Sequence, residues 1–356
     1  MKTKTIKKTL ANNKVIIGAL NCQGLIDKVD QTNFLQLSED FDIFGVSETW
    51  LKTQGNNGVA LPDFSFYHIS RKVKKGPVRG GVGVFIRNHL KKYVKVRYDI
   101  STENFLWCKI TKEYLGYFED LYLCFVYIPP EYSSREQMIK IDHFKHLQET
   151  KSKINSENVI LMGDFNARTM TISDTLHREK TDDLPADFFS SIYSERSNAD
   201  LVVNNYGKKL TDLCVATKSY IVNGRTLGDL QGKLTCFEEN GASTVDYAVA
   251  TEQMHRYVSK FQVLEPSCSD HCPIVLELKS RNISKEKNPS ITNMPARIRW
   301  NEETRLSFAL KMESPDTKQS INELNELVHS SDNVDTIVEK ISEIYNIDEK
   351  KTRKKA

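Results

Sequence analysis

Short apolar runs separated by polar stretches recur along the chain from residue 14 to residue 279. Ten of them have the length and the branched or aromatic side chains of β-strands: Val15–Asn21, Ile43–Glu48, Gly83–Arg87, Leu106–Ile110, Leu121–Tyr127, Val159–Asp164, Tyr220–Val222, Asp246–Ala250, Phe261–Leu264 and Ile274–Leu278. Apolar spacings of three and four predict helices over Gln31–Ser38, Arg135–Ile154 and Lys208–Ala216. Many strands with a few helices in one long unit indicate an α+β fold, in which two packed sheets are flanked by helices.

A change of composition after about Lys279 predicts where this unit ends. We expect a flexible basic N-terminus over residues 1–13, a domain over 14–279, a linker over 280–299 and a helical tail over 300–356. The polar residues 281–294 have the composition of a linker. Beyond them, apolar residues recur at helical spacing, and the chain closes with a basic run.

Polar side chains stand at the ends of the predicted strands with unusual regularity: Asn21, Glu48, Tyr127, Asp164 with Asn166, Asp246, and Asp270 with His271. A single aspartate at a strand end is commonly a turn or cap residue, and a single histidine is more often structural than functional. The same placement six times in one chain is hard to explain by turns alone. Carboxylate, amide and imidazole groups on the ends of core strands therefore predict an active site held on a rigid frame.

The charge distribution says more than the net charge of +3. Residues 71–97 contain ten Lys or Arg and no Asp or Glu, which indicates either a surface that attracts phosphate backbones or a solvated strand face. Seven scattered cysteines without zinc-site spacing predict reduced, mostly buried thiols and an intracellular protein. No stretch approaches transmembrane length and no secretory apolar segment follows the basic N-terminus, so no membrane partner is predicted.

Read in order, the strand-end strings resemble the endonuclease/exonuclease/phosphatase superfamily, which includes deoxyribonuclease I and the exonuclease III-like abasic-site endonucleases. The matching strings are Leu20-Asn21-Cys22, Ser47-Glu48-Thr49-Trp50, Val126-Tyr127-Ile128-Pro129-Pro130, Gly163-Asp164-Phe165-Asn166, Val245-Asp246-Tyr247 and Ser269-Asp270-His271. The resemblance spans residues 14–279. It implies a four-layer sandwich of two packed mixed β-sheets flanked by helices.

Within this superfamily the chain looks most like the endonuclease domains of non-LTR (LINE-type) retrotransposons. The strings that suggest this are Ser47-Glu48-Thr49-Trp50-Leu51, Arg79-Gly80-Gly81-Val82-Gly83-Val84, Asn223-Gly224-Arg225, Gly228-Asp229-Leu230-Gln231-Gly232 and Thr244-Val245-Asp246-Tyr247. The region after residue 280 is similar to the spacer that joins such a domain to a reverse transcriptase. No polymerase follows it, which leaves open a truncated element, a domesticated gene or a fragment of a gene.

The resemblance implies a phosphodiesterase that uses Mg²⁺, with Mn²⁺ as an alternative. It assigns the metal to Glu48, Asn21 and Asp270. Mg²⁺ prefers one or two carboxylates and keeps several waters, which suits two acids and one amide.

The remaining strand-end residues are assigned to the chemistry of the phosphate. Asp164 orients and deprotonates the attacking water, and Asn166 holds this water or the phosphate. His271 donates to a phosphate oxygen, while Asp246 accepts from the other ring nitrogen and favours the protonated ring. Tyr127 donates to the phosphate. The division of roles between Asp164 and Asp246 stays open.

Four further residues are candidates for contact with phosphate or DNA. They are Arg79 in the basic segment, Arg225, Thr235 and Ser269. Ser269 has an alternative role as the cap of the turn before Asp270. The segment 169–203 is an irregular insertion to which the sequence assigns no role.

The leading hypothesis is a Mg²⁺-dependent DNA endonuclease that nicks one strand and leaves a 3′-hydroxyl. DNA is then the partner, a nuclear location follows, and a reverse transcriptase supplied elsewhere is a possible second partner. The motifs serve equally in phosphodiesterases that act on phosphoinositides, sphingomyelin or RNA 3′ ends, so this alternative stays open. A third alternative is an inactive nucleic-acid-binding remnant, against which the intact set of motifs argues.

Overall fold

The computed structural model of the protein describes residues 14–52, 58–71, 78–133, 141–175, 196–281 and 314–330. The chain divides into two units, residues 1–286 and residues 287–356. The second unit contributes one described helix, α9 (Pro315–Ser330). The predicted linker of residues 280–299 lies almost wholly outside the described residues, so its bounds stay a prediction.

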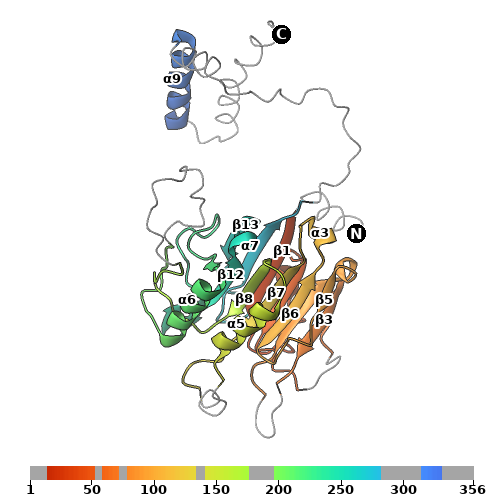
Figure 1. The fold of residues 1–356 in the computed structure, drawn as a ribbon. Helices are drawn as coiled ribbons and strands as arrows, with labels where there is room; N and C mark the ends of the chain where they lie inside the picture. Colours follow the sequence, from red (N-terminus) through yellow and green to blue (C-terminus); the bar gives the residue numbers. More distant parts are fainter. Residues whose placement is uncertain are drawn as a thin grey trace. The chain divides into compact units, whose positions relative to one another are not determined.

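Six strands form the first sheet of the larger unit, in the order β13-β14-β1-β2-β4-β3 (Figure 1). They are β1 (Lys14–Asn21), β2 (Ile43–Ser47), β3 (Phe64–Ile69), β4 (Val82–Arg87), β13 (Val258–Val263) and β14 (Ile274–Lys279). β1 and β2 are parallel, and every other neighbouring pair is antiparallel. The sheet is therefore mixed, as predicted.

The second sheet repeats this plan, in the order β5-β6-β7-β8-β12-β9. Its strands are β5 (Val94–Val96), β6 (Phe105–Ile110), β7 (Leu121–Tyr127), β8 (Val159–Asp164), β9 (Ser219–Ile221) and β12 (Asp246–Thr251). β7 and β8 form its parallel pair at the centre. A separate ribbon of β10 (Cys236–Glu238) and β11 (Gly241–Ser243) lies outside both sheets.

The two sheets pack face to face and helices cover their outer faces. Buried apolar side chains of both sheets form the central core, including Ile17 and Leu276 from the first and Phe125 and Met162 from the second. Phe125 packs so closely on β2 that a side chain at Gly45 would collide with its ring. The outer layers are α2 (Thr32–Ser38) on the first sheet, and α5 (His143–Lys153) and α6 (Asn205–Thr217) on the second. The predicted four-layer sandwich is confirmed.

All ten predicted strands are present, with ends that shift by up to three residues. The structure adds β3, β5 and the β10–β11 ribbon, as well as short helical turns at α3 (Lys112–Leu115), α7 (Glu252–His255) and η1 (Asn88–Leu90). α5 begins at His143, because Asp142 caps it by accepting from the amides of Phe144 and Lys145. The start predicted at Arg135 lies outside the described residues.

The described ends of the 169–203 insertion are anchored in the domain. Asp174 is buried, forms an ion pair with Arg225 at 2.6 Å and accepts from the amide of Ile221 at 2.7 Å. On the other side, Arg196 donates to the Thr169 hydroxyl and to the Met170 carbonyl. Both flanks thus belong to the packed structure around α6 and β9.

None of the described helices is both long enough and apolar enough to span a membrane. All seven cysteines are free, and six of them are buried. The prediction that the thiols are mostly buried is therefore confirmed, and their reduced state stays a prediction.

A buried histidine in α7 makes the stability of this domain depend on pH. His255 packs edge-on against Tyr220, and its Nε2 has no hydrogen-bond partner among the described residues. Burial, aided by the charge of Arg225, lowers the pKa of His255 to about 4. An unfolded histidine takes up a proton near pH 6.5, so acid favours the unfolded state. The stabilisation is present above about pH 6.5 and is lost as the pH falls toward 4.

We therefore expect His255→Phe to make the protein less sensitive to acid. Between about pH 7.5 and about pH 4, the wild-type protein should lose about 3 kcal/mol more of its unfolding free energy than the variant loses. Urea unfolding followed by circular dichroism across this range measures it. Parallel pH curves for the two proteins would show that His255 does not titrate as its burial indicates.

Candidate active site

The polar strand-end residues meet at one end of the sandwich. Asn21 ends β1, Tyr127 ends β7, Asp164 ends β8 and Asp246 begins β12, while Glu48 follows β2 and His271 precedes β14. The strand registers bring them together, because Tyr127 and Asp246 are the partners of Asp164 on either side. Glu48 comes directly after the β2 residue that pairs with Asn21. Both sheets thus contribute to one constellation.

Asn21 is the hub of this constellation. Its side-chain Nδ2 donates to Glu48 Oε1 at 2.9 Å and to Asp164 Oδ2 at 2.9 Å, and it lies 3.4 Å from His271 Nε2. The residue is 1 % exposed. Its Oδ1 accepts from the amide of Gln23 at 3.3 Å. One buried amide therefore ties two carboxylates together beside the imidazole.

Asp246 and His271 form a buried pair beside this hub. Nδ1 of His271 lies 2.9 Å from Asp246 Oδ2. Burial alone lowers the pKa of His271, but the charge of Asp246 and their hydrogen bond outweigh it and hold the pKa well above its usual range. His271 is therefore a cation, and its Nε2–H lies 3.4 Å from Asn21 Nδ2; because both groups are donors, this contact is not a hydrogen bond.

Asp164 is a buried carboxyl with a perturbed acidity. Burial, together with the charges of Asp246 and Glu48, raises its pKa to about 7, although the His271 cation and the Asn166 amide oppose the shift. Asn166 holds it by two bonds, from its main-chain N to Oδ1 at 2.8 Å and from Nδ2 to Oδ2 at 3.1 Å. A carboxyl that titrates near neutrality is suited to general-base chemistry.

Tyr127 and Trp50 complete the surroundings of Glu48. The Trp50 indole N–H donates to Glu48 Oε2 at 3.0 Å. Tyr127 is buried, and burial, together with the charge of nearby Glu48, raises the pKa of its hydroxyl, so the tyrosine stays neutral. Glu48 is itself half-buried and has neighbours on both carboxylate oxygens.

Backbone strain gathers at this end of the sandwich. Seven non-glycine residues in the described part of the chain have a positive φ, and four of them belong to this site: Gln23 (45°), Glu48 (50°), Trp50 (53°) and Asn166 (48°). Such conformations are unfavourable for residues with a side chain, and they persist where the surroundings enforce them.

Asp270 lies on the rim, apart from the buried group. It is exposed, and its Oδ2 accepts from the side chain of Gln23 at 3.4 Å. The Ser269 hydroxyl donates to Gln23 Oε1 at 3.2 Å and accepts from the amide of His271 at 3.3 Å. Ser269 therefore has the turn-capping geometry that was its alternative prediction.

Thr235 and Arg225, which were predicted to contact phosphate or DNA, are both buried in contacts with other residues of the protein. The Thr235 hydroxyl is fully buried and accepts from the amides of Val245 and Asp246, both at 3.0 Å. It thereby fixes the start of the strand that carries Asp246. Arg225 is 7 % exposed and is paired with buried Asp174. Neither side chain is presented at the surface for phosphate, because burial has committed each of them to the protein interior.

The described part of the basic segment, residues 71 and 78–97, does not form one surface beside the site. β4 pairs with β2 along its length, so Val82 lies next to Ser47 at the site end, and Arg87 lies at the opposite end. Arg71 and Arg87 are also buried. Arg79 is exposed at the site end, with its guanidinium 4.2 Å from the centre of a Trp50 ring.

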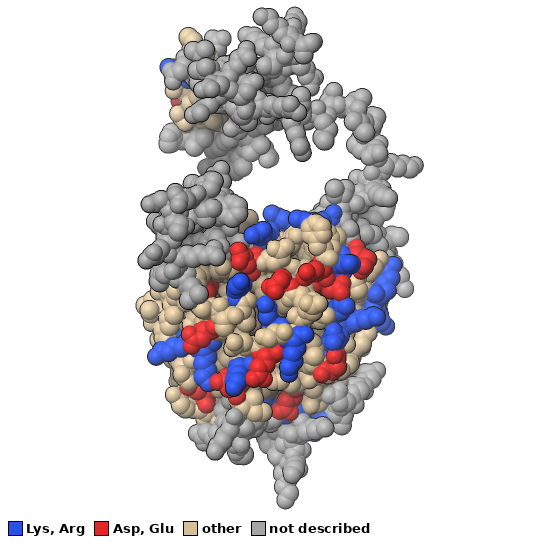
Figure 2. Space-filling model, in the orientation of Figure 1, with Lys and Arg blue, Asp and Glu red and all other residues tan. Residues whose placement is uncertain are grey.

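The outer face that carries α5 and α6 is also not a basic surface. Figure 2 shows Lys and Arg interspersed with Asp and Glu across the described part of this face. A surface of mixed sign gives no concentrated field for a polyanion.

Four residues that sequence reasoning did not single out support the site. Trp50 binds Glu48, and Gln23 joins Asn21 to the rim. The Asn223 side chain donates to the main-chain carbonyl of Asp246 and accepts from the main-chain amide of Ala248. Cys236 pairs with His271 in an isolated antiparallel bridge. Trp50 and Asn223 lie in strings that resemble the family, so the sequence offered a reason to consider them. Nothing in the sequence pointed to Gln23 or Cys236.

The donor set fits a divalent cation. Asp164 and Asp246 place a carboxylate oxygen each within 4.8 Å of one another and of a ring nitrogen of His271, and Glu48 adjoins them through Asn21. Because His271 is protonated, the carboxylates and not the imidazole are the ligands on offer. Carboxylates outnumber the single cation of the site, which favours a bound metal ion. Asn21 presents nitrogen to both carboxylates here, so a ligand role for its oxygen requires the amide to turn over.

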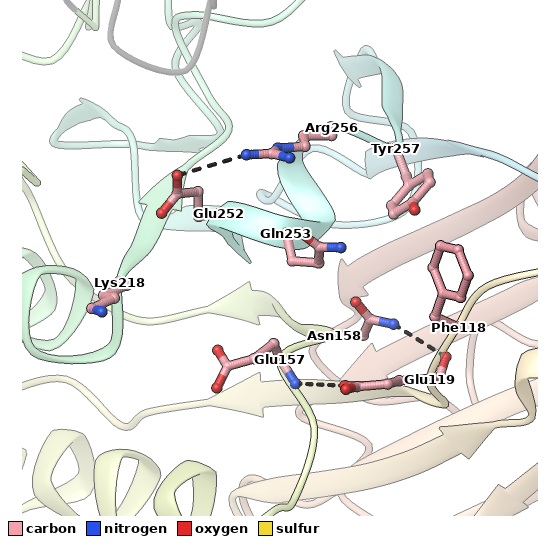
Figure 3. A pocket seen from close by; sticks show the side chains of 9 residues that line it. All are labelled: Phe118, Glu119, Glu157, Asn158, Lys218, Glu252, Gln253, Arg256 and Tyr257. Atoms are coloured by element: carbon pink, nitrogen blue, oxygen red, sulfur yellow. Dashed lines mark hydrogen bonds and ion pairs between the residues drawn. The ribbon is translucent and has the colours of Figure 1, made fainter. Parts of the chain in front are cut away.

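A pocket of about 440 Å³ lies at the opposite end of the second sheet (Figure 3). Glu157 and Asn158 precede β8 and Glu252 follows β12, whereas the site lies at the other ends of these strands. Its polar groups bond to one another, as between the Glu157 amide and Glu119 at 3.0 Å. It is no part of the candidate site.

Two stacked mixed sheets with clustered acids and a buried aspartate–histidine pair at one end have the architecture of a hydrolase. The Endonuclease/Exonuclease/phosphatase family matches residues 18–271, and the chain belongs to this family. It is accordingly a hydrolase of the nuclease and phosphatase type. A comparison with curated protein sequences found no match.

Solved structures share this fold at low sequence identity. The endonuclease domain of TRAS1, a telomere-specific non-LTR retrotransposon, is 16 % identical with a TM-score of 0.50, over 75 % of this chain and 99 % of that one. The AP endonuclease LMAP from Leishmania major is 12 % identical with a TM-score of 0.54, over 75 % and 88 %. The 3′ phosphatase NExo from Neisseria, bound to a product DNA hairpin, is 13 % identical with a TM-score of 0.50, over 74 % and 99 %.

Proposed function

We propose that the protein is a divalent-metal-dependent DNA endonuclease that nicks one strand and leaves a 3′-hydroxyl. The observation that carries the proposal is the cluster in which Asn21 joins Glu48 and Asp164 directly beside the buried His271–Asp246 pair. Hydrolysis of a phosphodiester needs a positioned water, a base for its proton and positive groups around the phosphate. The network offers one residue or pair for each need.

Asp164 activates the nucleophile, a water molecule. Its pKa near 7 lets it accept a proton from water at neutral pH, and Asn166 fixes its orientation through two hydrogen bonds. A buried carboxyl between fixed donors keeps one geometry as the substrate arrives.

His271 and Tyr127 are the donors to the phosphate. Asp246 keeps His271 protonated and fixes its ring, while Thr235 fixes Asp246 through its main chain. Tyr127 keeps its proton because it is buried. Fixed donors of this kind stabilise the charge that develops on phosphate oxygens.

Glu48 would hold the metal, with Asp270 at the rim and Asn21 between the carboxylates. Mg²⁺, or Mn²⁺ in its place, supplies charge neutralisation on the phosphoryl group when bound. A metal ion there also lowers the pKa of neighbouring carboxyls.

DNA as the substrate rests on the retrotransposon-like strings and on Arg79, whose exposed guanidinium lies over the Trp50 ring, the side chain that also binds Glu48. Similar structures include the endonuclease domain of a retrotransposon and a phosphatase bound to a DNA hairpin. A reverse transcriptase partner and a nuclear location follow from the same resemblance.

Incubation with supercoiled plasmid tests the proposal. We expect Mg²⁺-dependent conversion to open circles, loss of nicking in excess EDTA, and recovery when Mg²⁺ is restored. Extension of the nick by a DNA polymerase reports the 3′-hydroxyl. Glu48→Gln should abolish nicking, whereas Glu157→Gln, a matched change at the exposed far end, should not. Intact plasmid alongside hydrolysis of phosphoinositide or sphingomyelin would reassign the substrate.

A further inference from the structure

Trp50 makes two contacts that no other residue of the site combines in the described part of the chain. Its indole N–H donates to Glu48 Oε2 at 3.0 Å. One face of its rings lies under the Arg79 guanidinium, 4.2 Å from a ring centre. A single side chain thus touches both the acid assigned to the metal and an exposed cation.

The surroundings leave Trp50 little freedom. Its main-chain N donates to the Gly80 carbonyl at 3.0 Å, and the amide of Gly24 donates to the Glu48 carbonyl at 2.8 Å. A side chain at Gly24 would approach the ring to 2.9 Å, so the indole packs directly on this backbone. The ring therefore contacts both the Gly24 backbone and the Arg79 guanidinium, with its N–H directed at Glu48.

Arg79 is placed to meet an anion from outside. It is exposed and forms no ion pair with the carboxylates of the described residues. A guanidinium stacked on an aromatic face keeps its in-plane N–H groups available, and these match the oxygens of a phosphate. Because Arg79 and Gly24 occupy the neighbourhood of the ring, stacking of a nucleobase on Trp50 is disfavoured.

We propose that Trp50 is a positioning residue with two separable functions: its N–H orients Glu48 for the metal ion, and its ring holds Arg79 for a backbone phosphate of the substrate. The inference rests on the proposed metal-dependent nuclease function. The inference adds that one side chain, Trp50, both orients the metal ligand Glu48 and supports the residue that binds the nucleic-acid backbone.

Two variants separate the two functions. Trp50→Phe keeps an aromatic ring for Arg79 and removes the N–H, so Mg²⁺ affinity should fall about 10-fold to 100-fold, as for other groups that orient metal ligands. Affinity for a short DNA duplex in EDTA should stay within about threefold. Arg79→Ala should leave Mg²⁺ affinity in place, weaken DNA binding and reduce the slope of log affinity against log salt by about 1.

Calorimetric titration with Mg²⁺ and fluorescence anisotropy of the duplex in EDTA measure the two affinities without any turnover. Arg281→Ala is the matched control for Arg79, because Arg281 also lies over aromatic rings, those of Phe118 and Tyr257, beyond the far end of β14. It should change neither affinity by more than about twofold.

The outcomes discriminate between the inference and the function on which it rests. Absence of Mg²⁺ binding by the wild-type protein would overturn both. Normal Mg²⁺ affinity in folded Trp50→Phe would overturn the inference alone. If Trp50→Phe does not fold, Arg79→Ala still decides, because Arg79 is exposed: unchanged DNA affinity and salt slope would overturn the phosphate contact.

Discussion

Replacement of Asp164 by asparagine is expected to lower kcat for phosphodiester cleavage by about 10²- to 10⁴-fold, the range over which general bases contribute. Asparagine has nearly the same shape but cannot take a proton from water. It also turns an NH₂ group toward Asn21 or Asn166, both of which donate to Asp164 through their side chains. The loss therefore combines a missing base with a disturbed network.

Single-turnover cleavage at saturating DNA measures the effect on the chemical step. Asp212→Asn, the same change on the exposed side of α6, is the matched control and should cleave at the wild-type rate. Urea unfolding of both variants separates a catalytic loss from a loss of fold. A kcat within about threefold of wild type in Asp164→Asn would remove Asp164 from the role of base and point to Asp246.

The second large effect is expected at the His271–Asp246 pair. His271→Gln should lower kcat by about 10²- to 10³-fold, because a fixed charged donor to the phosphate is lost. Asp246→Asn should approach the same loss, since it deprives His271 of the carboxylate that keeps the ring oriented and protonated. The double variant should be no slower than His271→Gln alone, because the two residues act as one unit.

The same single-turnover assay on the two single variants and the double variant forms a complete cycle. Losses that multiply would mean that Asp246 acts on the reaction separately from His271. Thr235→Val tests whether the position of Asp246 depends on Thr235. The substitution removes the hydroxyl that accepts hydrogen bonds from the main-chain amides of Val245 and Asp246. It should behave as a weaker version of Asp246→Asn.

The strands that carry the site could be predicted because both sheets bury their central strands on two faces. Such strands are continuous apolar runs, and β7 and β8 were predicted to the residue. The missed strands are of another kind. β3 is an edge strand whose side chains are mostly half-buried, and β5 has three residues, so neither leaves a distinct pattern.

The site residues could be found because strand ends meet at the edge of a sheet. What the sequence cannot show is whether a polar side chain turns toward the site or into the interior. Arg225 and Thr235 lie in strings that resemble the family, yet both side chains are buried in structural contacts. Conversely, Trp50 bonds to Glu48 in a turn where both residues adopt positive φ, a backbone conformation that non-glycine residues do not predict from sequence.

The basic segment illustrates a second limit. Among its described residues, Arg79 and Arg87 are close together in the sequence, but β4 rises about 3.3 Å per residue between them and separates them to opposite ends of the sheet. Charge density along a chain becomes charge density on a surface only when the backbone turns back on itself.

The pairing of β14 with β1 has a consequence for how the enzyme comes into being. Residues Lys14–Ala19 pair with Ile274–Lys279, and His271, just before this last strand, meets Asn21 across 250 positions of sequence. During synthesis from the N-terminus, Glu48 and Asp164 emerge long before His271. The candidate active site is thus complete only when β14 is inserted between β13 and β1. A nascent chain, or one that ends before β14, therefore carries the acids of the site without His271.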